Sequence, residues 1–155
     1  MAIIKKVRGY EPEIGENTFL AESATIIGNC KIGKDCSIWY GAVLRGDVNA
    51  ITIGDRTNIQ DGCIVHEETH FGADCTVGHG AIVHGCTIGD NCLIGMGAVV
   101  LDGARIGDNC LVGAGSLVTG KMDAPAGSMI LGSPAKGLLP GFTGFQTFGG
   151  GNSFF

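Results

Sequence analysis

The chain has 155 residues, of which 28 are glycine, more than twice the usual share of about 7%. So much glycine argues against a helical bundle, whereas 45% hydrophobic residues suffice for one buried core and argue against disorder. The formal net charge of −5 argues against nucleic acid or an anionic membrane as the principal partner. We therefore expect one compact domain whose partner is a small molecule or a protein.

Residues 1–13 are expected to be a lead-in to this domain. The segment carries Lys5, Lys6 and Arg8, but no apolar run of signal-peptide length follows these charges. No stretch of the sequence approaches the roughly 18 apolar residues of a membrane span. The sequence therefore predicts a cytoplasmic protein that does not contact a membrane.

A six-residue repeat occupies residues 14–122. Apolar residues recur at every sixth position in three runs, which are separated by a three-residue insertion and a one-residue deletion. The eighteen positions are Ile14, Leu20, Ile26, Ile32, Ile38, Leu44, Ile53, Ile59, Val65, Phe71, Val77, Val83, Ile88, Ile94, Val100, Ile106, Val112 and Val118. Because a unit of one short strand and a turn cannot bury its apolar side chain alone, successive units must stack as a solenoid.

A second column of small residues stands four positions after most of the apolar ones. Six of the seven cysteines occupy it, namely Cys30, Cys36, Cys63, Cys75, Cys92 and Cys110. Cys86 lies outside the column, in the shortened repeat. No C-x-x-C pair is present, which argues against a zinc ribbon, and the odd number argues against a closed disulfide framework. We expect reduced, buried thiols that pack as small hydrophobic side chains.

The two columns form the motif apolar-Gly-x-x-small-x, which resembles that of the hexapeptide-repeat proteins. The resemblance implies an all-β fold, a left-handed parallel β-helix of triangular section with three hexapeptides in each coil, an exception to the usual right-handed crossover. Eighteen hexapeptides then make about six coils. At about 4.8 Å between neighbouring strands, the prism would be about 29 Å long.

The C-terminal part differs from the repeats. Residues 123–140 contain Pro125, Pro134 and Pro140 and are expected to form an exit loop; the stretch from Gly132 to Lys136 is similar to the exit segment of many hexapeptide proteins. Residues 141–155 are rich in glycine and phenylalanine, so a helix is not expected there. We predict an irregular tail. The alternative is that its phenylalanines cover the flank of the prism or a neighbouring subunit.

Two of the four histidines are spaced by one coil. His66 and His84 each follow an apolar repeat position and lie eighteen residues apart, so their side chains are predicted to stack about 5 Å apart. Two such imidazoles can share one metal ion, since Zn–N bonds are about 2.0–2.1 Å long. His70 has no partner at this spacing and is expected to be exposed. The alternative is that all these imidazoles lie on the surface without a metal.

His79 lies in a different slot, on another face of the predicted triangle, so it cannot easily complete the same site within one chain. If prisms lie side by side, His79 of one copy can meet His66 and His84 of the next, and such head-to-tail contacts close into a ring. The sequence thus predicts a homotrimer with three interfacial sites of three histidines. Each site would keep one position open for water, the pattern of catalytic zinc.

Three segments around the histidines carry a closer resemblance. They are Arg45-Gly46-Asp47 in the insertion, Asn58-Ile59-Gln60-Asp61-Gly62 ahead of His66, and the stretch from Val77 to Cys86. Together they resemble the γ-class carbonic anhydrases, over a match from about Val7 to Lys136. The resemblance implies metal ligation by His66 and His84 of one subunit and by His79 of the next.

The same resemblance implies roles for five polar residues. Gln60 and Asn58 would hydrogen-bond or orient the metal-bound water, while a salt-bridge network across the subunit boundary would consist of Arg45, Asp47 and Asp61. There are two alternatives without a function. Arg45 and Asp47 could form a solvated ion pair that stabilises the fold by at most about 1 kcal/mol. Asn58 and Gln60 could be turn and strand-surface residues.

The activity implied is the reversible hydration of CO2 to bicarbonate. A cation held by three neutral imidazoles lowers the pKa of a bound water from about 15.7 to about 7, so hydroxide is available at neutral pH. Turnover then requires an acid–base group to remove a proton. Compared with the most active members of the family, this chain has Val48 in place of a glutamate and lacks the acidic loop and the charged C-terminal helix. Glu67, Glu68 or His70 could carry the proton instead.

Two other functions remain open on this scaffold. One is an acyl-CoA-dependent acyltransferase or thioesterase, because hexapeptide acyltransferases share the repeat; the other is a metal-binding or assembly protein with little turnover. Acyl transfer that survives metal removal would favour the first. Zinc is the expected cofactor, although three imidazoles also suit Fe2+ and Co2+.

Overall fold

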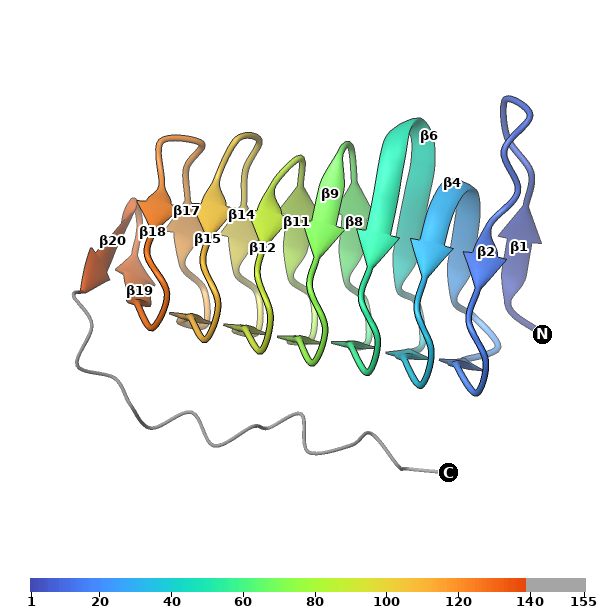
Figure 1. The fold of residues 1–155 in the computed structure, drawn as a ribbon, viewed down its shortest axis with the longest axis horizontal. Coiled ribbons are helices and arrows are strands. Elements are labelled where there is room, and N and C mark those ends of the chain that lie inside the picture. Colours follow the sequence, from blue (N-terminus) through green and yellow to red (C-terminus); the bar gives the residue numbers. More distant parts are fainter. Residues whose placement is uncertain (139–155) are drawn as a thin grey trace.

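The structure, a computed structural model, describes residues 1–138. They form a left-handed parallel β-helix, in which short strands of successive turns lie side by side along one long axis (Figure 1). These residues contain twenty strands and no α-helix, as the repeat predicted. In this part of the chain no helix is long and apolar enough to cross a membrane.

The strands line three faces of a prism, here named A, B and C in the order in which the chain visits them. Face A carries β1 (Ile3–Lys5), the first halves of β4 (Thr25–Ile32) and β6 (Val43–Ile53), β8 (Ile64–His66), β11 (Ile82–His84), β14 (Val99–Val100) and β17 (Leu117–Val118). Face B carries β2 (Glu13–Ile14), the second halves of β4 and β6, β9 (Thr69–Phe71), β12 (Thr87–Ile88), β15 (Arg105–Ile106) and β18 (Asp123–Ala124).

Face C forms the second hydrogen-bonded sheet. Its strands are β3 (Phe19–Leu20), β5 (Ser37–Ile38), β7 (Asn58–Ile59), β10 (Thr76–Val77), β13 (Leu93–Ile94), β16 (Leu111–Val112), β19 (Met129–Gly132) and β20 (Ala135–Leu138). Strand β20 pairs antiparallel with β19, whereas the other pairs are parallel. Each face thus has seven parallel strands, so the prism has about seven turns, one more than the repeat count predicted.

The apolar repeat fills the interior. Sixteen of its eighteen positions are buried, and the two partly exposed ones, Ile14 and Leu20, lie on β2 and β3, which have no earlier strand beside them on their faces. Removing a buried aliphatic side chain from water is worth about 1.5–3 kcal/mol. The stacked columns of Ile, Val and Leu therefore hold the turns together.

All seven cysteines are free and buried, including Cys86, in agreement with the sequence. Burial raises the pKa of Cys30 and Cys63 to about 11 and that of Cys86 to about 12. The structure adds a role that the sequence did not predict. At the edge between faces B and C, thiols and hydroxyls donate to carbonyl oxygens of the next turn, as from Cys75 to Gly89 at 3.1 Å and from Thr57 to Gly72 at 3.1 Å.

The solenoid begins earlier and ends later than the predicted segment 14–122. Strand β1 lies within the expected lead-in, and β18 and β19 continue faces B and C. Ala124 and Ile130 keep the spacing of six after Val118 and are buried, with 4% and 0% exposure. The exit loop predicted for 123–140 therefore begins too early. Pro125 is exposed at an edge between strands, a place where a proline does not interrupt a ladder.

Residues 139–155 lie outside the described part of the chain. They include the last two residues of the predicted exit loop and the whole predicted tail, 141–155.

The three-residue insertion lies at the edge between faces A and B. Between β4 and β6 the register shifts from the pair Gly28 and Gly46 to the pair Cys30 and Ile51, so residues 47–50 bulge out of the ladder within β6 and are here called the insertion loop. In Figure 1, β6 correspondingly rises above its neighbours. This loop brings Asp47 and Asn49 beside the histidines described below.

Substitutions at Ile130 and at its neighbour Leu131 test whether the seventh turn is part of the folded core. Replacing buried Ile130 with Ala should lower the free energy of unfolding by about 2–5 kcal/mol, because it leaves a cavity in the core. Leu131→Ala is the matched control, since Leu131 is 40% exposed, and should cost less than about 1 kcal/mol. Urea denaturation measures both. Equal, small effects would mean that the solenoid ends before Ile130.

Candidate metal centre

The edge between faces A and B brings together two imidazoles. Arg45, His66 and His84 stand in the same register on β6, β8 and β11, one turn above another. The rings of His66 and His84 have their centroids 5.0 Å apart, as the one-coil spacing predicted. Parallel stacking of turns thus suffices to pair these side chains.

The facing nitrogens of this pair have a separation that suits a metal ion. His66 Nδ1 lies 3.1 Å from His84 Nε2. Two nitrogens bonded to one tetrahedral zinc at 2.0–2.1 Å would lie about 3.3–3.4 Å apart. The pair therefore fits two neighbouring ligand positions with only a small adjustment.

Each imidazole also meets a carboxylate on its far side. His66 Nε2 lies 3.0 Å from Asp47 Oδ1, and His84 Nδ1 makes a short contact with Asp102 Oδ1. Arg45 Nη2 lies 3.4 Å from His66 Nδ1, and a guanidinium only donates, so this contact suits the tautomer in which Nδ1 accepts. In that tautomer the proton of His66 sits on Nε2, facing Asp47. With the His84 proton facing Asp102, both facing nitrogens offer lone pairs, the arrangement of metal-binding histidines.

Asp102 is the residue of this site that sequence reasoning missed. It follows β14 and lies beside Gly85 of the preceding turn, where a Cβ atom would stand 2.8 Å from the Asp102 carboxyl carbon. Gly85 also has a φ of +65°, which favours glycine. A partial signal was present, because Asp102 lies eighteen residues after His84, although the coil between β11 and β14 has only seventeen residues.

Asp47 and Arg45 form an ion pair within the chain, with Nη1 and Oδ2 2.8 Å apart. Partial burial acts to raise the pKa of Asp47, but the hydrogen bond from His66 and the charge of Arg45 outweigh it and lower the pKa. Asp61, the expected third member of the network, lies at the opposite edge of face A and contacts His79 instead. Within one chain, therefore, only two of the three residues expected in the salt-bridge network, Arg45 and Asp47, contact each other.

The turn after His66 and the strand β9 that follows it hold the predicted acid–base residues. Glu67 joins His66 and His84 in a group whose ligand atoms all lie within 4.8 Å of one another. Glu68 is exposed and lies 3.8 Å from the imidazole of His70, which is partly exposed on face B. Glu67 therefore points toward the histidine pair, whereas Glu68 and His70 face solvent together.

His79 stands at the edge between faces C and A, with the segment leading into β11 after it. Its side chain is 54% exposed, and its Nδ1 lies 3.1 Å from Asp61 Oδ1. After His79 the chain crosses face A as β11 and reaches His84 at the end of that strand. The two histidines therefore lie at opposite edges of face A. As the sequence predicted, one chain does not bring His79 to the other two.

Gln60 and Asn58 lie with His79, not with the histidine pair. They line one end of a groove of about 510 Å³ on face C, whose apolar lining includes Leu93, Met96 and Leu111. The amide oxygen of buried Asn58 accepts hydrogen bonds from Trp39 Nε1 at 2.8 Å and Ser37 Oγ at 3.1 Å. Asn58 can therefore offer only its NH2 group to a further partner.

Comparison with known proteins first defines the class. Residues 11–46 and 85–120 match the family described as bacterial transferase hexapeptide (six repeats). The chain is similar to a crystal structure of a Bacillus cereus protein described as a putative acetyltransferase, with 40% identity and a TM-score of 0.86 over 90% of this chain and 83% of that one. Fold and repeat together define a hexapeptide-repeat protein.

Two curated relatives narrow this class. Gamma carbonic anhydrase 2, mitochondrial, of Arabidopsis thaliana is 46% identical over 81% of this chain and 49% of its own length. A probable carbonic anhydrase of Methanocaldococcus jannaschii is 47% identical over 79% of this chain and 80% of its own length. The chain belongs to the γ-carbonic anhydrase family, and it spans about half the length of the plant relative.

Asp102 provides a test of the paired carboxylates. Asp102→Asn replaces the charged acceptor that orients the His84 ring with a weaker, neutral one, so the affinity for Zn2+ or Co2+ should fall about 10–100-fold. Asp123→Asn, an exposed carboxylate on face B, is the control and should leave the affinity unchanged. Competition with a chelator of known affinity measures both. Equal affinities for the two variants would contradict a role of Asp102 in metal binding.

Proposed function

We propose that the chain is a metal-dependent carbonic anhydrase, which hydrates CO2 reversibly to bicarbonate at sites shared between neighbouring copies. The observation that carries the proposal is the 3.1 Å separation of His66 Nδ1 and His84 Nε2, each ring backed by a carboxylate. His79, exposed at the opposite edge of face A, is the third expected ligand. The family relationship supports the same reaction.

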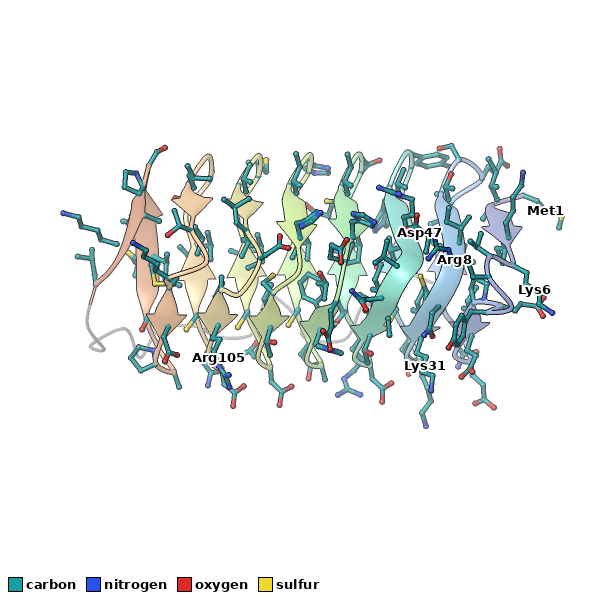
Figure 2. The ribbon with its side chains drawn as sticks, turned by 90° about the horizontal axis from the view of Figure 1, so that it is seen from above. Met1, Lys6, Arg8, Lys31, Asp47 and Arg105 are labelled. Carbon is teal, nitrogen blue, oxygen red and sulfur yellow. The ribbon has the colours of Figure 1, made fainter. Side chains whose placement is uncertain are left out.

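The outer surfaces of the faces support a ring of three copies. The outward row of face A is apolar apart from Thr25, whereas that of face B is polar. The apolar row comprises Val43, Ile64, Ile82, Val99 and Leu117, and the polar row comprises Glu13, Lys31, Thr52, His70, Thr87, Arg105 and Asp123. In Figure 2, Lys31 and Arg105 project from the same side. An apolar face A suits contact with other copies, and a polar face B suits solvent.

The positions of the three histidines on face A determine how such copies would meet. The histidine pair and His79 lie at opposite edges of face A. Suppose that face A of each of three copies turns toward a threefold axis. One edge of face A in each copy then meets the opposite edge of face A in the next copy, and these head-to-tail contacts close into a ring. Every junction then joins His66 and His84 of one copy to His79 of its neighbour. The same junction would carry Asp61 toward Arg45.

The residues at this junction fit hydration of a small uncharged molecule. When bound, a divalent ion would supply a hydroxide nucleophile at neutral pH, and the three imidazoles suit Zn2+, Fe2+ or Co2+. The amide of Gln60 and the NH2 group of Asn58 would orient the reacting groups. The groove lined by Leu93, Met96 and Leu111 suits an uncharged substrate such as CO2 better than a charged one. Glu67 and Glu68 lie on the turn that follows His66, and His70 lies on β9 beside Glu68, where they could carry the proton to solvent.

Acyl transfer is the second candidate, and the groove beside His79 favours it. Its volume of about 510 Å³ lies within the range of small-molecule sites, and an imidazole stands beside it. A metal is not required for an acyl group to pass from a thioester to an acceptor activated by histidine. Acetyl-CoA turnover that persists after complete metal removal would identify this function.

CO2 hydration and metal content test the first candidate. The metal-loaded protein should hydrate CO2 in stopped-flow assays, lose this activity with a chelator and regain it with added metal. His84→Ala should lose activity by more than about 100-fold, since it removes half of the histidine pair. Arg105→Ala, on the polar face B, serves as the control. Full activity in His84→Ala, or in the metal-free protein, would contradict the proposal, and bound metal without hydration would indicate a metal-binding protein.

A further inference from the structure

The histidine pair has a third potential ligand in its own chain. Ligand atoms of His66, Glu67 and His84 lie within 4.8 Å of one another, and no other such group of histidine, cysteine and acidic side chains occurs in residues 1–138. The family relationship leads one to expect that one chain supplies only two ligands to any one site. Two imidazoles and one carboxylate on one side of an ion form a ligand set that suits Fe2+ and Zn2+.

Glu67 is one of eight non-glycine residues in the described part of the chain with a positive φ. Its φ is +58°, in the left-handed region, which costs about 1 kcal/mol or more for a residue other than Gly, Asn or Asp. In the next turn, the residue after the histidine is Gly85, at a φ of +65°. The chain thus keeps a glutamate where the equivalent corner has a glycine.

Hydrogen bonds hold the corner in this conformation. Buried Thr69 donates from Oγ1 to the carbonyl oxygen of His66 at 2.7 Å and accepts from the Gly85 amide at 2.9 Å. Because this hydroxyl joins the two turns, the corner cannot relax without losing both bonds. The strain at Glu67 is therefore maintained by its surroundings, as at many functional positions.

The insertion loop holds the carboxylate from the other side. Asn49 Nδ2 donates to Glu67 Oε2 at 3.0 Å. A carboxylate fixed through one oxygen can bind an ion through the other, and Zn–O bonds are about 2.0–2.2 Å long. Asn49 and Asp47 belong to the same protruding loop, so this loop positions Glu67 as well as His66.

We propose that Glu67 is a metal ligand, so that a single copy of the chain holds the ion through His66, Glu67 and His84 before His79 of a neighbour joins it. The inference rests on the metal site of the proposed function but is independent of the reaction. The ion would enter a half-site already present on one chain. Formation of the ring would then complete the site and is not required for metal capture.

Titration of Co2+ into His79→Ala protein tests this inference. The variant should still bind one Co2+ per chain, with visible absorption that reports the ligand set. Adding Glu67→Gln to His79→Ala should weaken Co2+ binding about tenfold or more, because one of three remaining ligands is lost. Glu68→Gln in the same background is the matched control for affinity, since its carboxylate is exposed beside His70. Circular dichroism checks that each variant is folded.

The outcomes separate this inference from the proposed function. Equal Co2+ affinities for the Glu67→Gln and Glu68→Gln variants would refute ligation by Glu67, as would complete loss of binding in His79→Ala alone. Either result leaves the three-histidine site intact if the unmodified protein binds Co2+. Failure of the unmodified protein to bind Zn2+, Fe2+ or Co2+ would overturn the proposed metal site itself.

Discussion

Parallel stacking of successive turns is the constraint on which this structure depends. Neighbouring parallel strands must keep the spacing of a β-ladder, so a side chain in one turn lies directly beside its counterpart in the next. Inside the prism, this produces continuous columns such as Val65 and Val83. Outside, the same stacking aligns His66 with His84. Core and candidate metal site therefore follow from one geometric rule, and the irregular repeats shape the edge where the histidines meet.

Much of this geometry could be predicted from the sequence because the repeat is periodic. The spacing of six predicted the solenoid, the buried thiols and the stacked histidines. The seventh turn was missed because the prolines after Val118 appeared to end the repeat, although Ala124 and Ile130 continue it. Asp102 escaped notice because the one-residue deletion moves its backbone out of the His84 row, so that it lies beside Gly85.

Other features depend on contacts that periodicity does not describe. The amide oxygen of Asn58 binds Trp39 and Ser37, which come from the preceding turn and the edge beyond it. The orientation of Glu67 depends on Asn49 in the insertion loop and on Thr69. These side chains are fixed by irregular segments, where one turn does not predict the next. The irregular segments are therefore what makes the edge with the histidine pair differ from the regular edges of the prism.

The division of the site between two edges of face A is the central claim, and a mixture of two variants tests it most directly. His79→Ala and His84→Ala should each be inactive in CO2 hydration, and co-refolding them in equal amounts should restore about a quarter of the unmodified activity. That fraction follows because about three-quarters of random trimers are mixed, and each has one intact site of three. A mixture no more active than its components would contradict a site shared between copies.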